Sequence, residues 1–562
     1  MYSLSSINDF RRFVNSYLRH KSRIWLWILI IIGVLFIYSV GVESDIYLGD
    51  EAYHYRLTQI IYQTGHRPVY DNLMHWTPFS RMPILTDILW HYGLALIWFC
   101  VGGVNQAAAQ AYNAGFAALL IMGTYLLGKE LYDYKTGMLA SVFVIGVPML
   151  SALSITLHQD VAVASIAVFV LYFALKRHYV LAGIFLGLSL LMKRSTYYVV
   201  PALFLLIMLP KADSFLLLLK RPLSVMRKRF WKSVRPVVIV MIMTLIVQSP
   251  DWHFRIDNFG VSSIFPILPV PQFHVDDSSS QHHLQNKHLT GKLPELSTTT
   301  LKDQTHNILE TEVPRNLPKT QVYDISSPIS NPLAPLEFFG ISLIAAVLLY
   351  PFIKKSRKDY PILLICISGI IVYIVVGIKT WWMLRYLMIL VPYFGILAAR
   401  SIRCLPYRAG FLSKILLVGC ILQFIVVSVY VWKKRQVPAG LTNAYQYVRT
   451  NLPKEAVIMT PRTYQATLYT NRRAQWGTAY SYVDLAFLFW RSDEKGMLKI
   501  ARKYGTTHFL ISRDRVYDDR NRKNTHGYPL SFVIKMHKWS NVRNIYEKSG
   551  VSIWEIIPMC SK

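Results

Sequence analysis

The chain has 562 residues and a formal net charge of +30; 53% of its residues are hydrophobic and only 16% are charged. A soluble protein carries about 25% charged residues, so this composition excludes an ordinary soluble enzyme. Many separate apolar stretches approach the roughly 20 residues that cross a bilayer as a helix, and we expect an α-helical polytopic membrane protein.

The positive charge collects in short segments between the apolar stretches. This is the positive-inside distribution of membrane proteins, not a basic surface for nucleic acid, and we expect no nucleic-acid partner. The five cysteines show no spacing typical of a disulfide framework or a zinc site. The N-terminus is basic and lacks a cleavage site before the first apolar stretch, so we interpret that stretch as a retained first span.

Basic segments at the N-terminus, 211–235, 354–358 and 400–414 are expected in the cytoplasm. The predicted spans that satisfy this are 24–42, 107–127, 138–157, 161–175, 179–193, 196–210, 236–249, 335–353, 360–378, 384–399 and 412–431. This gives about 11 transmembrane helices, with the C-terminus outside. The count requires that 84–101 lies as an interfacial helix in the first outer loop; an ordinary crossing there is the alternative.

This threading divides the chain into a transmembrane domain, residues 1–433, with outer loops 43–106 and 250–334, and a soluble domain outside, residues 434–562. In the soluble domain the patterns predict helices at 444–451 and 494–504 and strands at 456–460, 508–512 and 551–557. We therefore expect a small C-terminal α/β domain. The histidines of the second loop are interpreted as solvated rather than metal-binding; they are His274, His282, His283 and His288.

Two acidic positions follow predicted spans on the outer side. Asp50 and Glu51 open a predicted helix directly after the first span, and Asp160 lies between two later spans. Acids in a first helical turn are favoured by the helix dipole alone, so capping explains them as well as catalysis does. An acid at membrane depth is costly unless it is paired or faces water, which makes Asp160 a functional candidate.

Cationic side chains fall on the same predicted face, namely Arg81, Lys193, Arg194 and Arg385. Each one alone is explained by snorkelling to lipid headgroups. Together with three acids they indicate a site that binds an anion beside a proton acceptor. Four neighbouring side chains are expected to line the substrate: Tyr53, His54, His158 and Tyr386.

The order of these motifs resembles the GT-C fold membrane glycosyltransferases, in particular the branch of protein O-mannosyltransferases and the lipid A aminoarabinose transferase. The motifs that carry the resemblance are Gly49-Asp50-Glu51-Ala52, Arg81-Met82-Pro83-Ile84, His158-Gln159-Asp160, Leu181 to Leu188 followed by Lys193, and Arg385-Tyr386-Leu387 with Pro392. They cover residues 24–200 and 379–400. Arg81 stands where the family has Lys, and Met82 where it has Pro, which leaves the geometry of that loop open.

The resemblance implies an inverting transferase that moves a sugar from a polyprenyl-phosphate donor to a lipid, glycan or protein acceptor, on the outer face of a prokaryotic plasma membrane. It implies that Asp50 is the general base and that Glu51 and Asp160 orient the acceptor or the sugar. The four cations would bind the donor phosphate. No cofactor is required by this chemistry, and a divalent metal is possible but not indicated.

Two other functions remain open at this stage. One is a transporter or flippase of an anionic lipid or sugar, and the other is a non-catalytic factor of envelope assembly. Transporters usually show internal repeats and broken helices near the midplane. The sequence has no clear repeat, and its candidate charges lie at the ends of the predicted spans.

Overall fold

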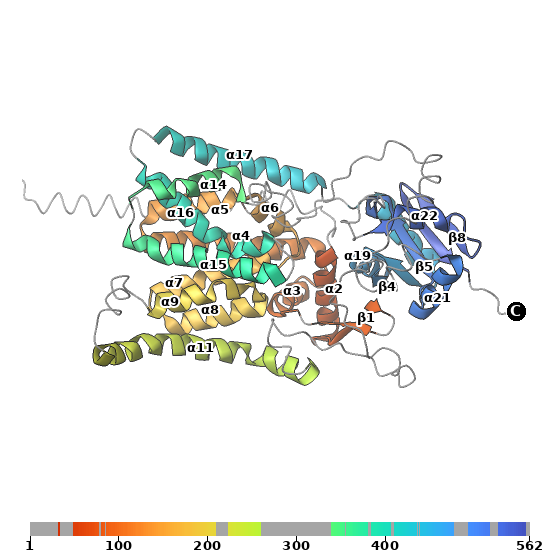
Figure 1. The fold of residues 1–562 in the computed structure, drawn as a ribbon, viewed down its shortest axis with the longest axis horizontal. Helices are drawn as coiled ribbons and strands as arrows, with labels where there is room; N and C mark the ends of the chain where they lie inside the picture. Colours follow the sequence, from red (N-terminus) through yellow and green to blue (C-terminus); the bar gives the residue numbers. More distant parts are fainter. Residues whose placement is uncertain are drawn as a thin grey trace, which may run out of the picture.

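The computed structural model describes residues 32–33, 49–77, 80–84, 86–208, 223–259, 339–354, 356–379, 384–405, 410–434, 437, 439–476, 493–517 and 527–557. A helical bundle occupies one end of the molecule and a mixed sheet with its helices the other (Figure 1). The bundle contains α4 (Gln106–Leu131), α5 (Tyr134–Ile145), α6 (Pro148–Ile155), α7 (Asp160–Leu175), α8 (Tyr179–Met192), α9 (Val200–Met208), α11 (Leu223–Phe259), α14 (Ile341–Leu348), α15 (Tyr360–Lys379), α16 (Val391–Cys404) and α17 (Gly410–Lys434).

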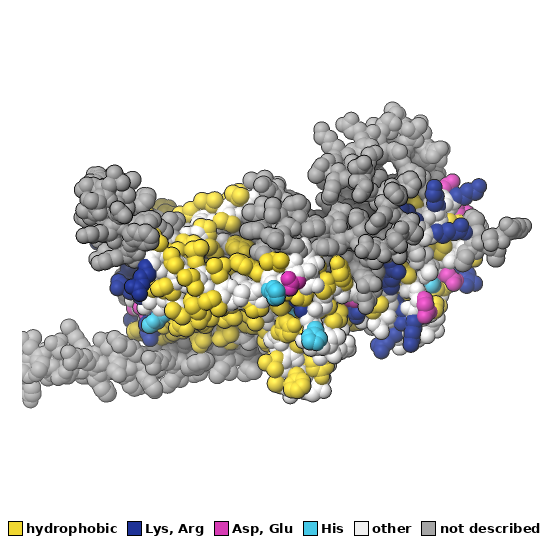
Figure 2. Space-filling view, turned by 90° about the horizontal axis from the view of Figure 1, so that it is seen from below, with side chains coloured by type: hydrophobic (Ala, Val, Ile, Leu, Met, Phe, Trp, Pro, Cys, Tyr) yellow, Lys and Arg dark blue, Asp and Glu magenta, His cyan; other side chains and the backbone are white. Residues whose placement is uncertain are grey.

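The surface of the bundle is apolar. Ile246 on α11 is 56% exposed and Val426 on α17 is 64% exposed, as expected for side chains that contact lipid rather than water. Figure 2 shows this apolar surface, with Lys and Arg side chains gathered at the far end of the bundle and over the sheet region. Within the described residues, four helices are long and apolar enough to cross a membrane, or five if the bent pair α5–α6, which turns by 66°, is one span.

Small residues allow α8 and α11 to approach closely. A Cβ atom on Gly183 would lie 2.7 Å from the carbonyl oxygen of Val240, and one on Gly187 would lie 2.6 Å from Cβ of Val247. The two glycines are four residues apart, so they share one face of α8, which is the small-xxx-small pattern of packed membrane helices. The packing holds the middle of α11 against α8.

The first outer loop is built from α2 (Gly49–Thr64), the hairpin β1 (Tyr70–Thr77) and β2 (Ser80–Pro83), and α3 (Leu89–Cys100). At 1.5 Å per residue, the 12 residues of α3 extend about 18 Å, too short for the roughly 30 Å hydrocarbon core. That 84–101 does not cross stays a prediction.

The sheet has seven strands in the order β2-β1-β4-β3-β5-β9-β8. Five of them come from the tail: β3 (Val457–Thr460), β4 (Arg473–Trp476), β5 (His508–Ser512), β8 (Val542–Lys548) and β9 (Val551–Ile556). The strands β1, β4, β3 and β5 are parallel, and β9 and β8 continue antiparallel. The tail helices are α18 (Ala439–Asn451), α19 (Thr463–Thr470), α21 (Glu494–Tyr504) and α22 (Leu530–Met536), and a second small sheet pairs β6 (Val516–Tyr517) with β7 (Tyr528–Pro529).

Two boundaries differ from those predicted. The sheet takes β1 and β2 from the first outer loop, with His75 opposite Gln475, so the tail from 434 onward does not form the sheet alone. Residues 250–259, predicted as the start of the second outer loop, continue α11 through Phe259. Asp251 and Arg255 continue that helix because both are paired with charged groups of other segments. Apart from residues 32 and 33, the predicted first span lies outside the described residues.

Candidate functional site

The candidate site lies where α2 meets the bundle, beside the sheet (Figure 1). Asp50 and Glu51 occupy the first turn of α2, and their side chains have different surroundings. Glu51 is 1% exposed, and its Oε1 accepts a hydrogen bond from the backbone N–H of Leu157 at 3.1 Å. Glu51 thereby joins α2 to the link between α6 and α7. Asp50 keeps 46% of its side chain exposed.

Asp50 pairs with Arg385, which lies on the 3₁₀ helix η5 (Leu384–Leu390) just before α16. Nη2 of Arg385 is 2.5 Å from Oδ2 of Asp50, and its Nη1 is 3.5 Å from Nε2 of His158. Burial by the surrounding protein raises the pKa of Asp50, but the charge and hydrogen bond of Arg385 and the nearby His158 and His54 together outweigh burial and hold that pKa well below the ordinary value of 3.8. Asp50 is therefore an ionised carboxylate.

A second pair lies beside the first. Nζ of Lys193 donates to Oδ1 of Asp160 at 2.6 Å, and the Asp160 side chain is 1% exposed. Its other oxygen, Oδ2, is buried and has no hydrogen-bond partner among the described residues. The ring of Tyr386 is 4.9 Å from Nζ of Lys193 and 5.7 Å from the guanidinium carbon of Arg385. The structure thus brings two acids and two cations together around one aromatic ring.

Aromatic and histidine side chains line one side of this group. His54 follows Asp50 by one helical turn, and its Nδ1 is 3.0 Å from Nε2 of His91. Burial lowers the pKa of His54 to about 3, helped by the nearby His158. The hydroxyl of Tyr53 bonds to the Thr86 hydroxyl at 2.7 Å, and burial raises the pKa of Tyr53 to about 12. The tail contributes Tyr464 from α19, whose ring centroid is 5.5 Å from that of Tyr53.

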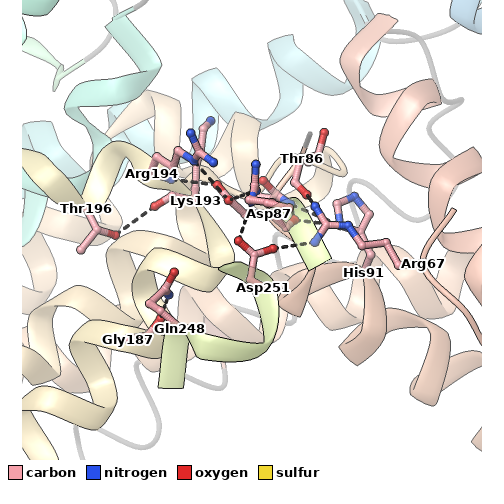
Figure 3. Close-up of polar contacts among 12 residues, drawn as sticks. Arg67, Thr86, Asp87, His91, Gly187, Lys193, Arg194, Thr196, Gln248 and Asp251 are labelled. Carbon is pink, nitrogen blue, oxygen red and sulfur yellow. Dashed lines mark hydrogen bonds and ion pairs between the residues drawn. The ribbon is translucent and has the colours of Figure 1, made fainter. Parts of the chain in front are cut away.

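Arg194 pairs with a different acid, Asp87, and its phosphate-binding role stays a prediction. Its backbone N–H donates to Oδ2 of Asp87 at 3.1 Å, and its Nε is 3.6 Å from Oδ1 (Figure 3). Asp87 also accepts from Nη2 of Arg255 at 2.7 Å, while Asp251 bonds to Arg255 at 2.5 Å and to Arg67 at 2.6 Å. This buried charge network joins α11 to the first outer loop and to η1 (Arg194–Tyr198). Neither Asp87 nor its ion pairs were predicted from the sequence.

Arg81 lies on β2, where its backbone pairs with His75; its side chain is outside the described part, as are the four histidines of the second loop. Among the described residues, no group of three or more His, Cys, Asp or Glu side chains is arranged to hold a metal ion. The phosphate-binding role of Arg81 stays a prediction.

Neither a scan against protein-family models nor a search of curated proteins found a match to this chain. Solved structures do match. The lipid A aminoarabinose transferase ArnT from Cupriavidus metallidurans, bound to undecaprenyl phosphate, superposes with a TM-score of 0.58 at 12% identity, over 94% of this chain and 97% of that one.

The oligosaccharyltransferase AglB from Archaeoglobus fulgidus, in complex with an inhibitory peptide and a dolichol-phosphate, gives a TM-score of 0.55 at 14% identity, over 87% of this chain and 69% of that one. The mycobacterial arabinofuranosyltransferase AftD gives 0.53 at 10% identity, over 95% of this chain and 40% of that one. These likenesses confirm the expected fold: the chain has the GT-C fold, and it is a polytopic helical membrane protein.

Proposed function

We propose that this GT-C membrane protein is an inverting glycosyltransferase, which moves a sugar from a polyprenyl-phosphate donor to a hydroxyl group of a lipid, glycan or protein acceptor. The observation that carries the proposal is the pairing of Asp50 with Arg385 beside that of Asp160 with Lys193. Two cations beside two carboxylates supply what transfer from a sugar phosphate requires, namely charge to stabilise the leaving phosphate and a base for the attacking hydroxyl. The related folds bind undecaprenyl phosphate in one case and dolichol-phosphate in another.

The cations suit the leaving group. When the bond between the anomeric carbon and the donor phosphate breaks, the electron pair leaves with the phosphate oxygen, and preorganised cations stabilise that charge. Arg385 can bind two phosphate oxygens at once through its planar guanidinium, and Lys193 adds a point charge. In the structure both cations are held by carboxylates, so the incoming phosphate replaces a carboxylate rather than bulk water.

The carboxylates suit the attacking side. As the acceptor hydroxyl attacks the anomeric carbon, its proton passes to the carboxylate of Asp50, and attack opposite the leaving phosphate inverts the configuration. While Arg385 pairs with Asp50 the carboxylate is a weak base, because the pair lowers its pKa. Binding of the donor phosphate to Arg385 would loosen that pair and make Asp50 more basic. Asp160 retains one buried oxygen, Oδ2, to accept a hydrogen bond from the sugar.

We place this site on the outer face of the membrane. The pairing of β1 with β4 puts the first outer loop and the tail at the same end of the bundle. A cysteine at the exposed position Lys548, introduced into a protein without its native cysteines, should react with an impermeant maleimide in spheroplasts. A cysteine at the exposed position Lys358 should not. The reverse pattern would invert the orientation.

The function itself is tested with purified protein in nanodiscs, supplied with a panel of polyprenyl-phosphate sugars and with lipid, glycan and peptide acceptors. Mass spectrometry should detect a glycosylated acceptor and released polyprenyl phosphate in equal amounts. Translocation of the donor across the bilayer without any transfer would favour a flippase instead.

A further inference from the structure

A histidine pair borders the site and has no part in the mechanism above. His54 lies on α2 four residues after Asp50, so the two side chains share one face of the helix. His91 lies on α3 and is fully buried. Its Nε2 is 3.0 Å from Nδ1 of His54, so one of these two nitrogens must donate and the other must accept.

The partners of His91 decide which nitrogen donates. Nδ1 of His91 lies 3.2 Å from the backbone carbonyl oxygen of Asp87, which can only accept, so the proton of His91 is on Nδ1. Gln159 donates to the same carbonyl at 3.2 Å and approaches Nδ1 of His91 only to 3.5 Å. Nε2 of His91 therefore has a lone pair and accepts from Nδ1 of His54. This assignment leaves the lone pair of neutral His54 on its own Nε2.

That Nε2 atom has no hydrogen-bond partner among the described residues, because the side-chain hydrogen bond of His54 is made through Nδ1. The ring is framed by Tyr53, Trp90 and His158, with centroid distances of 5.4, 5.9 and 6.4 Å. Burial, His158 and the charges of Lys193 and Arg385 keep the pKa of His54 low, so the ring stays neutral. His54 thus offers a hydrogen-bond acceptor whose direction is fixed by its partner.

We propose that His54 is a substrate-binding residue that accepts, through Nε2, a hydrogen bond from a hydroxyl group of the donor sugar or of the acceptor. His91 is the positioning residue that fixes its tautomer. This inference rests on the proposed glycosyl transfer. A neutral, half-buried acceptor favours substrates that carry the hydroxyl, because an analogue without it leaves the lone pair unpaired.

The tautomer is measured without any activity assay. Nitrogen-15 NMR of histidine-labelled protein, with His54 and His91 assigned by their single Gln variants, should show both rings neutral with the proton on Nδ1. A proton on Nε2 of His54, or a charged His54 at neutral pH, would overturn the proposal. This result stands even if the wild-type protein transfers no sugar, so it separates a failed inference from a failed function.

The contact is measured with two variants of His54. Gln can place its carbonyl oxygen near the position of Nε2, whereas the shorter Asn reaches only the position of Nδ1. We expect kcat/KM to fall about tenfold in His54→Asn, the size of one neutral hydrogen bond, and less in His54→Gln. Equal activities in the two variants, whether both near the wild type or both equally low, would overturn the proposal. His253→Asn, at a side chain that is 82% exposed, is the control.

Substrate analogues identify which hydroxyl is bound. If it belongs to the donor sugar, a deoxy donor should lower wild-type kcat/KM to the level of His54→Asn and should lower that variant no further. If it belongs to the acceptor, a deoxy acceptor should behave in this way. For His91, replacement by Phe should lower kcat/KM and move the His54 proton, and replacement by Gln, which retains an acceptor, should restore both. An unchanged His54 tautomer in His91→Phe would remove the positioning role.

Discussion

Replacing Asp50 with Asn should have different effects on turnover and on donor binding, and measuring both tests the proposed mechanism. Asn caps a helix about as well as Asp, so the fold of α2 should survive the change. The carboxylate that receives the proton is lost, and general-base catalysis is worth roughly 10²–10⁴ in rate. We therefore expect turnover to fall about 100-fold or more.

Donor binding should respond differently, because Asp50 and the donor phosphate compete for Arg385. The Asp50 side chain is 46% exposed, and solvent limits such a pair to about 1 kcal/mol or less, which corresponds to a factor of about five. Affinity for polyprenyl phosphate should thus be unchanged or up to about fivefold tighter in Asp50→Asn. A mutation that merely damaged the site would weaken binding and turnover together.

The assay is transfer from a polyprenyl-phosphate sugar by protein in nanodiscs, with polyprenyl phosphate binding measured separately by fluorescence. Asp133→Asn is a matched control. Asp133 follows the C-terminal end of α4, caps α5 and pairs with Arg403, and 43% of its side chain is exposed. Near-wild-type turnover in Asp50→Asn would refute the assignment of the base, and the proton acceptor would then be sought at Asp160.

Three further outcomes follow from the same geometry. The donor KM should rise about tenfold to a hundredfold in Arg385→Ala, because charged hydrogen bonds contribute about 1.5–3 kcal/mol. It should rise less in Arg385→Lys, because Lys keeps the charge without the bidentate geometry. Equal KM values in both variants and the wild type would remove Arg385 from the site. The pKa of Asp50 is held below 3.8 and that of His54 is about 3, so both groups keep one protonation state above pH 5. A plot of log kcat/KM against pH should therefore be flat from pH 5 to 8. A sloping limb in that range that disappears in His54→Gln would contradict this prediction. Arg255→Met breaks buried ion pairs and should lower the free energy of unfolding by about 3–5 kcal/mol. In the control Arg543→Met, at a side chain that is 65% exposed, the free energy of unfolding should change by about 1 kcal/mol or less. Similar thermal midpoints of the two variants in detergent would refute the structural role of the Asp87 network.

Local signals in the sequence were sufficient for several elements. The helix 494–504 and the strand 508–512 have the bounds that were predicted. The reason is local: the Asp493 side chain accepts from the N–H of Gly496 at the start of the helix, and Gly505 ends it with φ +61°. Such signals need no knowledge of the rest of the chain.

Contacts between distant segments had no such signal. Asp50 and Arg385 are 335 residues apart, and only the sidedness of the predicted spans placed them on one face. Sidedness did not separate Lys193, which reaches Asp160, from its neighbour Arg194, which reaches Asp87. Lys193 lies between α8 and η1 and Arg194 begins η1, so these adjacent side chains point in different directions, and the direction of each depends on what packs around it. The partners of Asp87 on α11 were missed for the same reason.

The boundary predicted at 434 separates two compositions rather than two independent folding units. Strand β1 of the first outer loop completes the sheet beside β4, and α19 packs on α2 through Tyr464 and Tyr53. Because Tyr53 lies on α2 only three residues after Asp50, a shift of the tail relative to the bundle would move the helix that carries the proposed base. The sheet therefore supports the geometry of the site through α2, and the Asp87 network supports it through η1, which begins directly after Lys193.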